Sequence, residues 1–195
     1  RECERRSLKI TTSISDGTGF DADQVEESAR TEKASGVILM SSGDKLDLGD
    51  LVKTGLSMVV MNGEEQLRRA DAVIPANGFA ASVAVRHLID AGHRHVLMLG
   101  TTGRDHLTTR RTGFAEAIEA HELNAHETIT AAEDSVEAGE AAVAARLGET
   151  GDLGGATAIF CLSDPLAEGA LKALSAAGLD VPADVSVIGC DGIRE

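Results

Sequence analysis

The strongest constraint on the fold is a repeated order of short apolar runs and segments with a helical pattern. The runs are nearly continuous in apolar residues and span 36–40, 57–61, 96–99, 156–161 and 185–190. Such short runs are typical of strands that are covered on both faces in a parallel sheet. Residues 8–13 alternate weakly and predict a further strand, and residues 72–75 are a weaker strand candidate.

Helical patterns fill the intervals between these runs. They cover residues 21–34, 77–91, 108–121, 135–147 and 164–177. Asn77 and Asp164 stand where N-caps belong, with Pro165 at the first helical position and Gly178 past the end of the last helix. The predicted inward faces are Phe79, Val83, Leu88 and Ile89 in one helix, and Phe114, Ala117 and Ile118 in the next.

The alternation of strands and helices predicts an α/β fold. Right-handed crossovers then build doubly wound parallel sheets flanked by helices. A chain of 195 residues is long enough for two small lobes that each bury a core. The best hinge candidate is the turn at Ala76-Asn77-Gly78, which follows Pro75. We therefore expect one lobe over residues 1–75 and a second over residues 76–195.

Composition excludes several classes of function for this segment. The net charge is −14 without a cluster of Lys and Arg, whereas duplex binding needs clustered cations that displace phosphate counterions. Cys3, Cys161 and Cys190 form no CxxC pair, which favours free thiols in a reducing, cytoplasmic compartment. No apolar run has membrane-spanning length, so we expect no membrane partner.

Polar side chains follow several of the predicted strands. In an open parallel sheet, ligands bind beyond the carboxyl ends of the strands. Residues just past those ends should therefore converge on one rim. The candidates for a binding site at this rim are Asn62, Arg110, Phe160, Ser163 and Asp191.

Arg110 is the most informative candidate. It lies four residues before Phe114, on the inward stripe and near the positive end of the helix dipole, where a cation is mildly unfavourable. An arginine fork in that position suits a carboxylate, a phosphate or a sugar diol. The alternative is a solvated surface arginine, which is our interpretation of Arg111.

The other candidates each have a structural alternative. Asp191 either caps the turn after its strand or binds ligand hydroxyls, and Ser163 could act in either way. Phe160 is by default a core residue, although its place at a strand end would allow ring stacking. Asn62 is a polar loop residue without a strong local signal.

Signals for an enzyme are weak. Residues 16–19, Asp-Gly-Thr-Gly, lack the third glycine of a dinucleotide fingerprint. His93 and His95 stand two apart without a third metal ligand, and neither a P-loop nor a G-x-S-x-G elbow occurs. Cys161 and Cys190 have no evident basic partner. We therefore expect a protein that is not an enzyme, with no catalytic residue, no metal and no cofactor.

Several sequence blocks, taken in order, resemble the LacI/GalR family of bacterial transcription regulators. These blocks span residues 85–96, 110–114, 156–164, 169–174 and 178–191 and cover most of residues 77–191. Residues 2–76 fit the first lobe of that family less sharply, through 36–40 and 57–62. The resemblance implies an effector-binding core with the type I periplasmic-binding-protein-like fold, in which the effector binds between two lobes.

The resemblance also implies a role for each rim residue. Arg110 matches the arginine that grips the effector, and Asp191 matches the acid after the last strand that accepts hydrogen bonds from it. Phe160 stands where some relatives stack an aromatic ring on the effector. Ser163 stands where many relatives have asparagine, and Asn62 where many have aspartate.

Cys190 and Gly192 depart from the family pattern, in place of the usual aromatic and a common second acid. Membership would imply a small polar effector, a sugar or sugar derivative, in a homodimer that binds DNA through a helix-turn-helix headpiece outside this segment. With the headpiece and the returning C-terminal segment missing, the expected core is incomplete at both ends. Effector binding would bias one of two lobe orientations and so alter operator affinity.

Two rival interpretations remain at this point. One is an exported solute-binding protein of a sugar transporter, which shares the fold and the crevice. The other is a small-molecule enzyme on a doubly wound sheet, since fold does not fix function.

Overall fold

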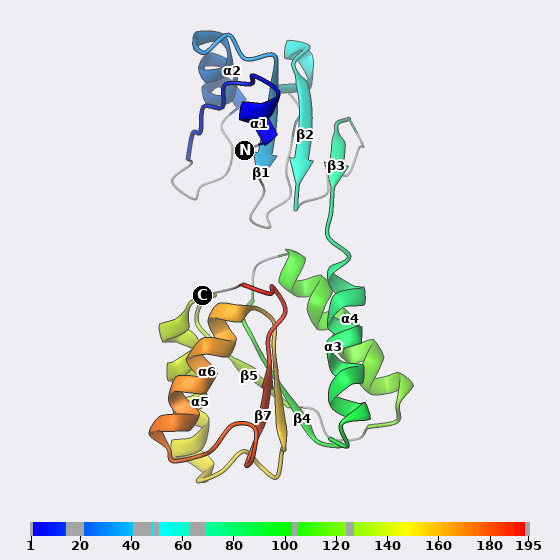
Figure 1. Cartoon of the computed structure of the whole chain (residues 1–195), viewed down its shortest axis with the longest axis vertical. Helices are drawn as coiled ribbons and strands as arrows, with labels where there is room; N and C mark the ends of the chain where they lie inside the picture. The colour runs from blue at the N-terminus through cyan, green and yellow to red at the C-terminus, as the bar shows by residue number, and fades with distance from the viewer. Residues whose placement is uncertain are drawn as a thin grey trace. The chain divides into compact units, whose positions relative to one another are not determined.

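A computed structural model of the protein combines parallel strands with helices, which alternate regularly from α3 onwards (Figure 1). The structure describes residues 2–14, 22–40, 48, 51–62, 69–102, 105–123 and 127–193. The chain divides into two units, Arg1–Pro75 and Ala76–Glu195. Both units are α/β with parallel sheets, which confirms the predicted fold class.

The first unit has a three-stranded parallel sheet in the order β1-β2-β3. Its elements are α1 (Glu2–Arg5), α2 (Ala22–Thr31), β1 (Gly36–Met40), the 3-10 helix η1 (Leu51–Thr54), β2 (Ser57–Met61) and β3 (Asp71–Val73). Gly36 is in register with Ser57, and Val59 with Asp71. The core consists of Leu39, Leu48, Leu51, Met58 and Val60.

Two predictions for the first unit are wrong. Residues 8–13 form no strand. Side chains of β1 are not covered on both faces by the described part of the chain, because Ile38 and Met40 are 66% and 70% exposed while Leu39 between them is buried. Although the run is continuously apolar, exposed and buried side chains alternate along it, and only one face of β1 packs against the core.

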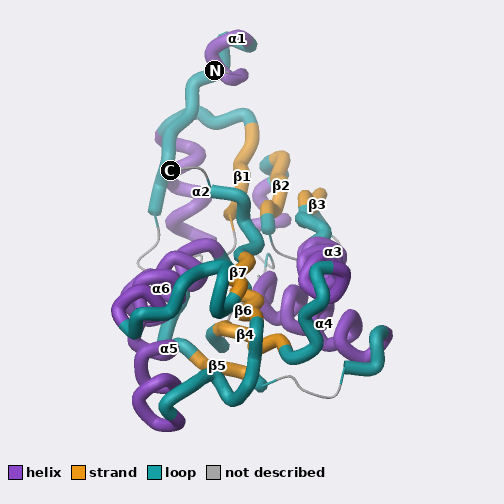
Figure 2. The backbone as a smooth tube through the Cα atoms, turned by 60° about the horizontal axis from the view of Figure 1, so that its bottom comes forward, coloured by secondary structure: helices purple, strands orange, loops and turns teal. Residues whose placement is uncertain are grey.

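The second unit has a four-stranded parallel sheet in the order β5-β4-β6-β7. Its strands are β4 (Val96–Gly100), β5 (Thr128–Thr130), β6 (Ala158–Cys161) and β7 (Ser186–Ile188). Its helices are α3 (Asn77–Asp90), α4 (Asp105–Ala120), α5 (Val136–Thr150) and α6 (Asp164–Ala176). Figures 1 and 2 show α3 and α4 on one face of this sheet and α5 and α6 on the other. The second unit is thus doubly wound.

The core of the second unit lies on both faces of the central strands. Every residue of β4 and β6 is buried, as their continuous apolar runs predicted. The predicted inward stripe of α4, with Phe114, Ala117 and Ile118, is also buried. No helix in the described ranges is long and apolar enough to cross a membrane.

The predicted inward face of α3 is only half right. Phe79 and Val83 are 72% and 50% exposed, and the buried apolar residues are Ala81, Val85, Leu88 and Ile89. The first turn of α3 packs tightly against α4, because a Cβ added to Gly113 would clash with the backbone of Gly78. Small side chains therefore face inward in the first half of α3.

Candidate functional site

The connection between β6 and α6 is the centre of the rim at the carboxyl end of the second sheet. We use the name β6–α6 connection for Leu162, Ser163 and Asp164, that is, the two residues after β6 and the first residue of α6. Each of its three residues hydrogen-bonds to a different neighbouring segment: α4, the loop after β5 and the loop after β7. Three segments far apart in the sequence therefore meet at one short stretch of backbone.

Arg110 projects from α4 into this rim and is only 8% exposed. Its Nε donates to Asn77 Oδ1 at 3.1 Å, and its Nη1 donates to the Leu162 carbonyl oxygen at 2.6 Å. The same Nη1 lies 2.7 Å from Asp191 Oδ1 in an ion pair. Arg110 is therefore a buried, multiply held guanidinium and not a solvated surface arginine. Arg111 is also held, because its Nη2 donates to the Thr101 carbonyl oxygen at 2.7 Å.

Asn77 does not cap α3, so this prediction is wrong. The N-cap position belongs to Ala76, which offers no side-chain cap, and Asn77 is the first residue of the helix. The Asn77 side chain is buried instead, and its amide oxygen accepts the hydrogen bond from Arg110. Asn77 thereby orients the guanidinium, a role that its sequence position did not indicate.

Ser163, and not the predicted Asp164, is the N-cap of α6. The Ser163 Oγ accepts a hydrogen bond from the Leu166 N–H, and Asp164 is the first helical residue with Pro165 second. Ser163 Oγ also donates a short hydrogen bond to Asp134 Oδ1. The Ser163 hydroxyl therefore donates one hydrogen bond and accepts another, and Ser163 is only 2% exposed.

Asp164 binds the loop that follows β7. Its Oδ1 accepts from the Cys190 and Asp191 N–H groups at 2.9 and 3.0 Å, and its Oδ2 accepts from the Ile193 N–H at 2.7 Å. Asp191 returns the contact, since its Oδ2 accepts from the Asp164 N–H at 3.0 Å. The carboxylates of Asp164 and Asp191 thus each accept a hydrogen bond from the backbone N–H of the other residue. These bonds fix the position from which the Asp191 side chain reaches Arg110.

The pKa of Asp164 is lowered by this arrangement. Burial alone would raise the pKa, but the backbone N–H groups of residues 190–193 together outweigh it and favour the carboxylate. A carboxyl group with a depressed pKa in the folded state stabilises the fold at pH values above its unfolded pKa of about 4. That contribution is lost as the pH falls through the folded pKa.

We expect Asp164→Asn to lower the free energy of unfolding by about 1–2 kcal/mol at pH 7, because charged hydrogen bonds become neutral ones. The difference from the wild type should stay constant between about pH 6 and 8 and shrink below about pH 4. Urea unfolding across this pH range measures it. Asp90→Asn, at the exposed end of α3, is the matched control. A loss of unfolding free energy in Asp164→Asn that does not change with pH would contradict the lowered pKa of Asp164.

The surroundings of Phe160 and Asn62 differ from those of the other three candidate residues. The Phe160 side chain has no exposed surface, and its ring stacks on Phe114 with centroids 5.6 Å apart. Phe160 is therefore a core residue in this structure, and its stacking on an effector stays a prediction. Asn62 lies in the first unit after β2, with a positive φ of 58° and its N–H bonded to the Val73 carbonyl oxygen. Its side-chain role stays a prediction.

The sequence patterns did not indicate Asp134 as a member of the rim. Asp134 follows β5, whose Thr-Ile-Thr sequence is too short to be recognised as an apolar run. Without that strand, no carboxyl end was expected there. The available signal was the polar stretch before the helix N-cap Ser135, whose side chain accepts from the Ala138 N–H.

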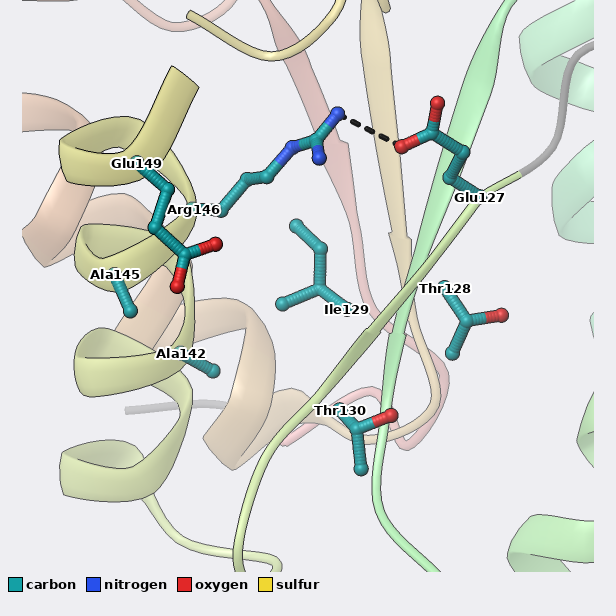
Figure 3. A pocket seen from close by; sticks show the side chains of 8 residues that line it. All are labelled: Glu127, Thr128, Ile129, Thr130, Ala142, Ala145, Arg146 and Glu149. Atoms are coloured by element: carbon teal, nitrogen blue, oxygen red, sulfur yellow. Dashed lines mark hydrogen bonds and ion pairs between the residues drawn. The ribbon is translucent and has the colours of Figure 1, made fainter. Parts of the chain in front are cut away.

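A separate pocket lies between β5 and α5 and contains none of the five predicted residues (Figure 3). Its volume is about 250 Å³. Arg146 and Glu127 form an ion pair of 2.7 Å within its lining, and Ile129 and Ala142 provide apolar surface. The ion pair lies at the start of β5, away from the carboxyl ends of the strands where ligands bind in doubly wound sheets.

Several residues that were considered as metal ligands or nucleophiles have other surroundings in the described part of the chain. No three His, Cys, Asp or Glu side chains gather there as metal ligands. His93 instead bridges the hydroxyls of Thr157 and Ser186. Burial raises the pKa of the Cys161 thiol far above its ordinary value, which disfavours the reactive thiolate. The glycine-rich residues 16–19 lie outside the described residues.

The chain is similar to proteins of a known family. Residues 85–194 match the periplasmic binding protein-like domain. The chain is 32% identical over 188 residues to an uncharacterized HTH-type transcriptional regulator of Streptomyces limosus, covering 89% of this chain and 51% of that protein. It is 28% identical over 183 residues to the ribose operon repressor of Haemophilus influenzae, covering 91% of this chain and 54% of that protein. The chain thus spans about half the length of these curated relatives.

Solved structures show the same fold. A LacI transcriptional regulator from a Rhodococcus species superposes with a TM-score of 0.81 at 24% identity, over 98% of this chain and 70% of that one. At this level of identity the likeness concerns the fold alone.

Proposed function

This chain belongs to the periplasmic binding protein-like domain family, in the form carried by LacI/GalR regulators, and we propose that it is the effector-sensing part of such a regulator. The effector is a small polar molecule, a sugar or sugar derivative, that binds at the rim around Arg110 and Asp191. Its binding alters operator affinity in a homodimer whose DNA contacts come from a headpiece outside this segment. The chain catalyses no reaction.

The observation that carries this proposal is the ion pair between the buried Arg110 guanidinium and the partly exposed Asp191 carboxylate. A guanidinium and a carboxylate from separate elements, both at the carboxyl end of the sheet, offer the donors and acceptors that a polar ligand needs. The relatives support a regulator over a transporter component or an enzyme, since curated relatives carry the names of transcriptional regulators. The name of the ribose operon repressor supports a sugar as the class of effector.

The mechanism follows from differential affinity. An effector shifts a two-state equilibrium only by the difference in its affinity for the two states, typically about 1–3 kcal/mol. The β6–α6 connection joins α4, the loop after β5 and the loop after β7 through hydrogen bonds. An effector that replaces or reinforces one of these bonds would therefore alter the positions of all three segments together.

The test is a thermal-shift screen of sugars, amino sugars, sugar phosphates, nucleobases and polyols. An effector at a hundredfold its Kd should stabilise the protein by about 2.7 kcal/mol. We expect Asp191→Asn to weaken binding of that effector at least tenfold, because the variant loses the charge facing Arg110. Calorimetric titration measures the change in Kd.

Glu119→Gln is the matched control, because Glu119 is an exposed carboxylate on the helix that carries Arg110. It should leave the Kd unchanged. If no compound stabilises the wild type, or if Asp191→Asn binds the effector as tightly as the wild type, the proposed function or its site is wrong.

A further inference from the structure

We propose that Asn77 is a positioning residue that links effector binding at the rim to the start of α3, the first helix of the second unit. Asn77 holds the Arg110 guanidinium in the orientation that receives the effector, and effector binding in turn restrains the first turn of α3. This inference rests on the proposed function, because it takes the rim around Arg110 and Asp191 as the effector site. It adds a residue that acts through Arg110 and a route by which binding is transmitted.

The guanidinium of Arg110 is held at two of its nitrogens. Nη1 donates to the Leu162 carbonyl oxygen at 2.6 Å and lies 2.7 Å from Asp191 Oδ1, while Nε donates to Asn77 Oδ1 at 3.1 Å. Contacts at Nη1 alone would let the planar group pivot about that nitrogen, and a second anchor at Nε fixes its plane. Asn77 therefore sets the direction in which the other N–H groups of the fork point.

The surroundings of the Asn77 side chain suit this task. Asn77 is the first residue of α3 and does not cap the helix, yet it is only 5% exposed. A buried amide costs free energy unless it is hydrogen-bonded, and the bond from Arg110 offsets that cost. The close approach of Gly78 to Gly113 keeps the first turn of α3 against the helix that carries Arg110.

The place of Asn77 in the chain gives this hydrogen bond a second consequence. The two units divide between Pro75 and Ala76, so Asn77 is the second residue of the second unit. The Ala76 carbonyl oxygen accepts a hydrogen bond from the Ala80 N–H at 2.9 Å, which ties the residue before α3 to the first turn of the helix. An effector that restrains Arg110 therefore also restrains the backbone that continues into the first unit.

Two variants separate the hydrogen bond of Asn77 from the volume of its side chain. Asn77→Leu keeps a branched side chain but has no acceptor, whereas Asn77→Asp has the same shape and keeps an oxygen in the place of Oδ1. Calorimetric titrations would use ribose and glucose as probes, and the compound that binds most tightly in the wider screen if neither sugar binds. We expect the Kd to rise at least about tenfold in Asn77→Leu and to stay within about threefold of the wild type in Asn77→Asp, because only leucine removes the acceptor of a charged donor.

Ser82→Ala is the matched control for these variants. The Ser82 hydroxyl donates to the Phe79 carbonyl oxygen at 2.8 Å on the same helix. The substitution thus removes a side-chain hydrogen bond from α3 without removing a contact of Arg110, and it should leave the Kd unchanged.

Hydrogen–deuterium exchange follows the route to α3. In the wild type saturated with the probe that binds, we expect exchange at the amides of residues 80 and 81 to slow at least about threefold, because these amides lie in the first turn that Asn77 restrains. In Asn77→Leu at the same saturation, this slowing should be lost, while the slowing at residues 190–193 around Asp191 remains.

The outcomes separate this inference from the proposed function. The inference is wrong if a folded Asn77→Leu protein binds as tightly as the wild type, or if Asn77→Asp loses as much affinity as Asn77→Leu. It is also wrong if exchange at residues 80 and 81 of the wild type does not respond to the probe. In each case, slowed exchange at residues 190–193 would leave the effector site standing.

If Asn77→Leu does not fold, the exchange of the wild type at residues 80 and 81 decides the inference. If neither sugar and no compound of the wider screen binds the wild type, the proposed function fails, and this inference fails with it.

Discussion

Arg110→Ala should destabilise the second unit by about 2–4 kcal/mol, in addition to removing its contact with an effector. The side chain is buried and satisfies the Asn77 amide oxygen, the Leu162 carbonyl oxygen and Asp191. Breaking a buried ion pair from one side typically costs about 3–5 kcal/mol, and the partial exposure of Asp191 reduces this figure. Urea unfolding followed by circular dichroism measures the loss.

Asp191→Ala provides the comparison for that result. Asp191 retains 28% side-chain exposure where Arg110 retains 10%, so we expect the loss on the aspartate side to be smaller. Arg111→Ala should cost less than either change, because one hydrogen bond to the Thr101 carbonyl oxygen is its described contact. Equal stability of Arg110→Ala and the wild type would contradict the buried position of the guanidinium.

The second large effect is expected at Gly169, where α6 crosses α5. A Cβ at Gly169 would overlap the Val136 carbonyl oxygen and lie 2.5 Å from the Glu140 amide nitrogen. Both obstacles are backbone atoms, so a rotamer change cannot relieve the clash. We expect Gly169→Ala to lower the free energy of unfolding by about 3 kcal/mol or more, at the upper end of overpacking effects. Thermal unfolding monitored by calorimetry checks this value.

Gly148→Ala is the matched control for this prediction. Gly148 also lies inside a helix, α5, but an added Cβ there meets nothing within 4 Å. The substitution should stabilise the protein by about 0.5–1 kcal/mol, because alanine has the higher helix propensity. Opposite signs for the two Gly→Ala changes test the close approach of α5 and α6. If both variants lost stability, the close contact between α5 and α6 would not be the cause of the effect at Gly169.

The sequence predicted the fold best where burial is complete on both faces. Leu97 and Ile159 belong to apolar runs that became the fully buried strands β4 and β6. The predictions failed where the local pattern was weak or where packing overrode it. Thr128–Thr130 is too short to register as a strand, and Phe79 lies off the face of α3 on which Ala81 and Val85 are buried.

The proximity of three candidate residues could be predicted from the sequence, but their contacts could not. The carboxyl-end rule identified Arg110, Ser163 and Asp191, and hydrogen bonds do bring these three to one rim. The rule does not reveal that Asn77 turns inward to hold the guanidinium, nor that Ser163 rather than Asp164 caps α6. Those features depend on pairings between distant segments, which local pattern does not encode.

Hydrogen–deuterium exchange of the protein with and without the effector tests the location of the site most directly. We predict that effector binding slows exchange at the amides of residues 162–164, 166 and 190–193, which surround Arg110 and Asp191, while residues 127–130 and 142–149 around the pocket of Figure 3 exchange as before. Slowed exchange at the pocket with no change at the rim would contradict the account.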